Sequence, residues 1–132
     1  MRMIADTNVL LRFVLADDIE QYKLALDAMK KSEAVAVTNH ALCEMAWALR
    51  SRYGVSRSAI AATIRGLLDT SNVVLDSATI NAGLTMLDAG ADFADGVIAH
   101  EGRWLGGEVF VSFDRKAVTA LDRQGMKAKL LE

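Results

Sequence analysis

The sequence predicts an α/β protein in which helices cover a short, mostly parallel sheet. Two observations favour this class. Short apolar runs of strand character alternate with longer segments whose apolar residues recur at helical spacing, and such alternation is typical of parallel strands joined by helices. Proline is absent from the 132 residues, which fits tightly joined elements.

Length and composition fit one soluble globular domain over residues 1–132. Hydrophobic residues make up 52% of the chain and charged residues 24%, which excludes a disordered protein. No apolar run approaches the ~18 residues of a membrane helix, and the N-terminus lacks the pattern of a secretion signal. The single cysteine, Cys43, is expected as a small buried hydrophobe in a reducing environment. We therefore expect a cytoplasmic protein.

The first two helices are predicted by apolar spacing and by their ends. After a short buried strand at 3–5, apolar residues recur at helical spacing from Thr7 to a stop near 16–18. An aspartate of that stop can cap the second helix. Two lysines at 30–31 close it, because cations suit the negative end of the helix dipole.

Two more helices follow a second strand at 34–37. Thr38 or Asn39 can cap the third helix, which stops near Gly54, and Ser56 begins the fourth. Both helices carry apolar residues along one side, so each is expected to pack that side against the rest of the protein.

The second half of the chain repeats the alternation. A fifth helix lies between a short strand at 73–75 and Gly90, and Asp92 is placed to cap a sixth helix over 93–105. The chain closes with the strongest strand of the sequence, a short helix and an edge strand, at 108–113, 116–121 and 128–131.

Four acids have placements that could bring them to one place. Asp6 follows the first strand and Asp114 follows the strongest one, and ligands of open α/β sheets gather at the carboxyl ends of strands. Glu44 lies one turn into the third helix beside small residues, which leave room for an approaching group. Asp95 is followed by a run of small apolar residues, which indicates a pocket.

Each acid also has a purely structural explanation. Asp6, Asp92 and Asp114 can cap the helices that follow them, and Glu44 can pair with His40 four residues earlier. Asp95 can lie in the first turn of its helix, near the positive end of the dipole. Four clustered carboxylates, however, need a counter-charge, which a divalent cation supplies. All-oxygen ligation suits Mg²⁺ or Mn²⁺, whereas one cysteine and two histidines argue against zinc. Such a site performs phosphoryl chemistry.

The order of these acids resembles that of PIN-domain ribonucleases, and more narrowly that of VapC-type toxins of bacterial type II toxin–antitoxin modules. The likeness rests on residues 4–10, 92–99 and 112–114 and on the helix around Glu44, and it spans residues 3–131. It implies a three-layer α/β/α fold and an endoribonuclease site that uses Mg²⁺, with Mn²⁺ as a possible substitute. The residues that match the family's catalytic, metal-binding quartet are Asp6, Glu44, Asp95 and Asp114.

The resemblance also implies residues that support the quartet. Thr7 and Ser112 match hydroxyl positions beside the acids, where they can position a carboxylate or a water. Asp92 matches an additional acid often present in the family. Gly96 is smaller than the alanine expected there, which we take as a minor difference.

The family further implies an RNA substrate, a homodimer and a cognate antitoxin whose C-terminal segment lies in a groove near the site. Arg12 and Lys116, each a few residues beyond a site acid, are the expected RNA contacts. Contacts of this kind attract phosphate without reading sequence. Four apolar residues could line the antitoxin groove or simply fill the core: Leu11, Val14, Met45 and Trp47.

The sequence is also compatible with other functions. A phosphatase with Asp6 as nucleophile usually needs a second acid two residues on, where Asn8 stands. A phospho-acceptor needs a well-placed lysine, and Lys116 fits only loosely. A catalytically silent PIN-like module could bind RNA or a partner without cutting it, although the complete quartet argues against lost activity.

Overall fold

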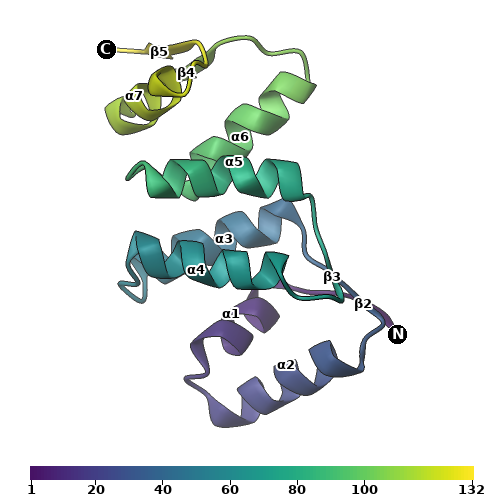
Figure 1. Ribbon diagram of the computed structural model, residues 1–132. Coiled ribbons are helices and arrows are strands. Elements are labelled where there is room, and N and C mark those ends of the chain that lie inside the picture. The colour runs from purple at the N-terminus through teal and green to yellow at the C-terminus, as the bar shows by residue number, and fades with distance from the viewer. The chain divides into compact units, whose positions relative to one another are not determined.

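The computed structural model describes residues 1–132 as seven helices and five short strands (Figure 1). Every strand pairing is parallel, which confirms the predicted α/β class. The chain divides into two compact units, an N-terminal unit (Met1–Asp76) and a C-terminal unit (Ser77–Glu132). No helix reaches the length and apolarity needed to cross a bilayer.

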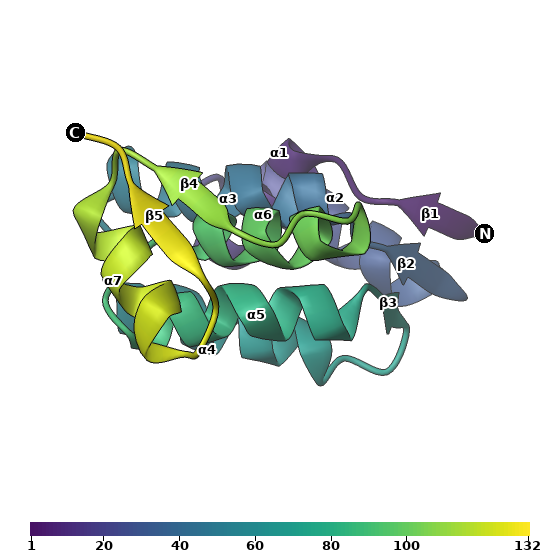
Figure 2. The ribbon, with the colours of Figure 1, turned by 90° about the horizontal axis from the view of Figure 1, so that it is seen from above.

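The N-terminal unit is built on a three-stranded sheet. Its strands β1 (Arg2–Ile4), β2 (Ala34–Ala36) and β3 (Val73–Val74) lie in that order, as Figure 2 shows. Val35 of the central strand pairs with Met3 on one side and Val73 on the other, and it has no exposed surface. A β-branched residue suits this central, buried position.

Four helices accompany this sheet: α1 (Thr7–Leu15), α2 (Ile19–Lys31), α3 (Asn39–Ser51) and α4 (Arg57–Leu68). Side chains cap three of them as predicted. Asp18 accepts a hydrogen bond from the backbone N–H of Gln21, Thr38 from that of Ala41, and Ser56 from that of Ala59. Each bond satisfies an N–H that the first helical turn leaves without a partner. α1 packs against both α2 and α3, and α3 packs against α4.

The C-terminal unit combines two packed helices with a β–α–β segment. α5 (Ser77–Asp88) lies against α6 (Phe93–Trp104), and β4 (Phe110–Ser112) leads through α7 (Arg115–Arg123) to β5 (Ala128–Leu130). The core cluster of this unit includes Met86, Ala91, Ala99, Ala117, Ala120 and Leu121. The five strands therefore form two parallel sheets, one in each unit.

β4 is shorter than its sequence predicts, and apolar side chains in and beside it are exposed. The expected strand covered 108–113, whereas the ladder with β5 covers only 110–112. Val109, Val111 and Phe113 are 47%, 50% and 80% exposed. The apolar run indicated a strand correctly, but burial depends on which elements pack against its faces, and a local pattern carries no information on that.

Candidate active site

A pocket of about 510 Å³ lies where β1 leads into α1, beside α3. Asp6 stands at the cap position of α1, yet its side chain accepts no hydrogen bond from the helix. The capping explanation of this acid is therefore not realised, and its carboxylate is available to the pocket. Thr7, Glu44 and Trp47 line the same pocket.

Two side chains hold the carboxylate of Glu44. Thr7 Oγ1 donates a hydrogen bond to Glu44 Oε1 over 3.3 Å, and His40 Nε2 lies 2.8 Å from the same oxygen. The pairing with His40 predicted from their spacing is thus present. Because both contacts use Oε1, the other oxygen, Oε2, can take a further ligand.

The apolar residues predicted for a groove differ sharply in exposure. Trp47 is 61% exposed and lines the pocket, and Leu11 lines it although only 4% of Leu11 is exposed. Val14 is half-buried. Met45 has no exposed surface, so of the two alternatives given for it, groove and core, it fills the core. Cys43, expected in the core, is partly exposed and lines the pocket.

Three carboxylates gather in the C-terminal unit. Asp92 immediately precedes α6, Asp95 lies in its first turn, and Asp114 connects β4 to α7. One oxygen from each of the three lies within 4.8 Å of the others. Carboxylate oxygens at this spacing can be bridged by one divalent cation, and Mg²⁺ and Mn²⁺ prefer such ligands.

The electrostatics of this triad fit a cation. The pKa of Asp95 is raised above its ordinary value, chiefly because the carboxyl is partly buried, and further because Asp114 and Asp92 carry like charges. Three acids that repel one another at this spacing have a counter-charge to gain. A bound metal ion would supply it.

Asp114 has two roles in the structure. Its Oδ1 accepts hydrogen bonds from the backbone N–H groups of Lys116 at 3.0 Å and Ala117 at 3.4 Å, so it caps α7 as its structural explanation predicted. Ser112 Oγ in turn accepts a hydrogen bond from the backbone N–H of Asp114 at 2.9 Å. These contacts fix the orientation of the acid that joins Asp92 and Asp95.

Asp92 contributes more to this cluster than a supporting role implies. It occupies the cap position of α6 but accepts no capping hydrogen bond, as Asp6 does at α1. Acids at other cap positions, such as Asp18 and Asp114, do accept such bonds. Asp92 and Asp6 are therefore the acids whose placement helix capping does not explain.

The predicted quartet is distributed over the two units. Asp6 and Glu44 line the pocket of the N-terminal unit, whereas Asp95 and Asp114 belong to the triad of the C-terminal unit. The two residues of each pair come from different elements, so each pair is a product of folding.

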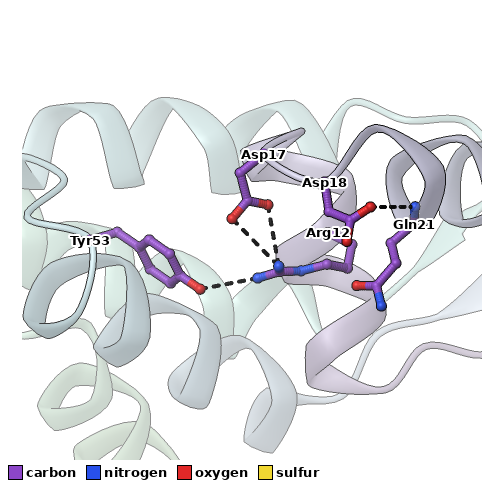
Figure 3. Close-up of polar contacts among 5 residues, drawn as sticks. All are labelled: Arg12, Asp17, Asp18, Gln21 and Tyr53. Atoms are coloured by element: carbon purple, nitrogen blue, oxygen red, sulfur yellow. Dashed lines mark hydrogen bonds and ion pairs between the residues drawn. The ribbon is translucent and has the colours of Figure 1, made fainter.

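Arg12, one of the two predicted RNA contacts, has two side-chain partners in the protein, Tyr53 and Asp17 (Figure 3). Its Nη2 donates to the hydroxyl of Tyr53 at 3.1 Å, and its Nη1 lies 3.3 Å from Asp17 Oδ1. The hydrogen bond to Tyr53, and then the charge of Asp17, raise the pKa of the guanidinium. Only 21% of the side chain is exposed. These partners give Arg12 a structural role, and its contact with RNA stays a prediction.

The other predicted contact, Lys116, is exposed. It lines a second cavity of about 600 Å³ together with Arg115 and Arg123 of the same helix. Arg52 was one of several basic residues that the sequence suggested near the site, but Arg12 and Lys116 were preferred to it. The guanidinium carbon of Arg52 lies 5.5 Å from the centre of the Trp47 ring, and both residues line the pocket of Asp6 and Glu44.

Comparison with known proteins supplies the family context. The model of the PIN domain family matches residues 3–122, a span that contains all five acids of the pocket and the triad. No curated protein matches the chain.

Proposed function

Because the chain belongs to the PIN domain family, we propose that it is a metal-dependent endoribonuclease that hydrolyses phosphodiester bonds in RNA with Mg²⁺ or Mn²⁺. PIN domains are typically metal-dependent nucleases. The observation that carries the proposal is the triad of Asp92, Asp95 and Asp114, whose oxygens lie within 4.8 Å of one another.

In this proposal Asp92, Asp95 and Asp114 hold the cation, and Asp6 and Glu44 keep the metal-binding and catalytic roles that the resemblance to PIN-domain ribonucleases implies for them. The bound ion would stabilise charge on the phosphate and promote ionisation of the attacking water. Glu44, whose carboxylate is oriented by Thr7 and His40, would serve as a proton acceptor during hydrolysis.

Cleavage of RNA by the purified protein tests the proposal. Cleavage should require Mg²⁺ or Mn²⁺ and stop in chelator, and Asp95→Asn should lower the rate at least about 100-fold. Asp122→Asn is the matched control, because it makes the same substitution in α7 outside both acid groups. Equal cleavage by wild type and Asp95→Asn would identify a contaminating nuclease, and the cleavage would then no longer support the proposed activity.

Metal binding provides an independent test. Calorimetric titration with Mn²⁺ should show binding to wild type and weaker binding to Asp95→Asn and Asp6→Ala. Unchanged binding in Asp6→Ala would exclude Asp6 from the metal site. A protein that neither binds Mn²⁺ nor cleaves RNA would instead be the silent binding module.

We further propose that the enzyme is a VapC-type toxin, acting in the cytoplasm as a homodimer and blocked by a cognate antitoxin. The order of the acidic motifs supports this, as does an open pocket with an exposed apolar side chain, Trp47. Induced expression in bacteria should arrest growth, and Asp95→Asn should not. If bacteria grow normally while they express a wild-type protein that cleaves RNA when purified, the toxin role is rejected and the nuclease activity stands.

A further inference from the structure

We propose that Trp47 is a stacking platform for an unpaired base of the substrate RNA, which makes the enzyme selective for single-stranded RNA at that nucleotide. The inference rests on the proposed function and specifies how the same site takes its substrate.

Trp47 lies on the face of α3 that lines the pocket. Trp47 lies three residues after Glu44, one turn along the same helix face, and both line the pocket. The opposite face of α3 is fully packed, since Leu42, Met45 and Leu49 are at most 2% exposed. Trp47 is 61% exposed. The helix therefore directs its largest side chain toward the acids instead of the core.

Arg52 packs over the indole ring of Trp47. Its guanidinium carbon lies 5.5 Å from the ring centre, within the range of a cation–π contact. This contact restrains the ring while most of the residue remains exposed. A stacking surface that is already oriented loses less conformational freedom when a ligand binds.

The charges of the pocket favour a base beside Trp47. Asp6 and Glu44 repel a phosphate that lacks a metal partner, but they do not repel an uncharged base. Arg52 can pair with a neighbouring phosphate. The pocket thus offers an aromatic face for the base and a cation for the backbone.

Size and access point to single-stranded RNA. A pocket of about 510 Å³ has the volume typical of small-ligand sites and can receive one nucleotide. A base within a duplex has both faces covered by its neighbours, whereas an unpaired base can stack on an aromatic side chain.

Fluorescence can test this directly, because Trp47 and Trp104 are the two tryptophans. In a Trp104→Phe background, Trp47 is the only indole reporter. A short single-stranded RNA, titrated in chelator at low salt so that it is bound and not cut, should quench this emission. An abasic strand of equal length should quench little and bind about 5- to 100-fold more weakly, which is the range expected for one lost stacking contact.

Variants separate stacking from folding. In the wild-type background, Trp47→Ala should lose about 5- to 100-fold in affinity for single-stranded RNA, and Trp47→Phe should recover part of it. Trp104→Ala, which removes another exposed indole, should bind like wild type. Unchanged circular dichroism and Mn²⁺ affinity in Trp47→Ala would show that fold and metal site are intact.

Two results would overturn the inference. One is wild-type RNA affinity in Trp47→Ala, which would leave the exposed indole to a protein partner. The other is equal affinity for duplex and single-stranded RNA. Binding is measured without cleavage, so an active nuclease could still give either of these results, and only the stacking proposal would then fail. If Trp47 stacks on RNA but the protein never cleaves it with metal, only the proposed nuclease activity is rejected.

Discussion

Thr7 Oγ1 donates a hydrogen bond to Glu44 Oε1 over 3.3 Å, which joins the first turn of α1 to α3 across 37 positions of sequence. The same oxygen lies 2.8 Å from His40 Nε2. Glu44 is otherwise a flexible side chain, 54% exposed, so these two contacts determine where its carboxylate lies. Residues that orient a catalytic or metal-binding carboxylate affect activity without touching substrate.

Removal of the Thr7 hydroxyl should therefore slow catalysis. We expect Thr7→Val, which keeps the shape of the side chain, to lower kcat for RNA cleavage by about 10- to 100-fold with little change in KM. Thr7→Ser retains the hydroxyl and should stay near wild type. Steady-state kinetics on a defined RNA measure both constants. Wild-type kcat in Thr7→Val would show that this hydrogen bond does not position Glu44.

Asp95 should make stability depend on pH. Its folded-state pKa lies above the unfolded value, so the folded protein holds the proton more tightly. The resulting stabilisation is complete below the ordinary pKa of 3.8 and is lost as pH rises through the folded value. At neutral pH the ionised carboxylate therefore destabilises the metal-free protein.

Asp95→Asn should accordingly raise the Tm of the metal-free protein at neutral pH, and the gain should shrink at pH values below 3.8. Added Mn²⁺ should raise the Tm of wild type more than that of the variant. Thermal unfolding followed by circular dichroism measures these shifts. A lower Tm for the variant in chelator would mean that repulsion and burial do not dominate at this carboxyl.

Arg12 should contribute to stability and not to RNA affinity. Arg12→Gln removes the contacts to Tyr53 and Asp17 and should lower the free energy of unfolding by about 1 kcal/mol. The salt dependence of RNA binding should stay as in wild type, whereas Lys116→Gln should reduce its slope by about 1. Urea unfolding and binding titrations at several salt concentrations give the two quantities. A reduced slope in Arg12→Gln would instead support the RNA contact predicted from the sequence.

Local chemistry explains which parts of this structure could be predicted from sequence. Thr38 and Ser56 were identifiable as caps because a cap depends on groups within three residues. The partners of Arg12 show the opposite case. Tyr53 lies 41 positions away, so nothing near Arg12 distinguishes an engaged guanidinium from a free one.

The site acids could be predicted only in part from the sequence. Order and spacing were enough to select Asp6, Glu44, Asp95 and Asp114, because strand ends and helix starts were predictable. Asp92 was placed in a supporting role, since an acid before a helix usually caps it. Only the folded geometry distinguishes Asp114, which accepts capping hydrogen bonds, from Asp92, which does not.

Gly96 was regarded as a minor difference, and the structure assigns it a packing role. A Cβ at this position would lie 2.4 Å from the carbonyl oxygen of Ala82 and 2.8 Å from Gly83 Cα. Both are backbone atoms of α5, so they cannot move aside as a flexible side chain does. The close approach of α5 and α6 therefore requires glycine at the residue that follows Asp95.

Gly96→Ala should force the two helices apart and lower the free energy of unfolding by about 1–3 kcal/mol. Because Asp95 is adjacent, Mn²⁺ affinity should fall as well. Gly66→Ala in α4 is the matched control. Gly66 is exposed, nothing lies within 4 Å of its added Cβ, and alanine should stabilise that helix by about 0.5–1 kcal/mol. Urea unfolding of both variants measures the contrast, and equal effects would show that α5 and α6 can separate at little cost.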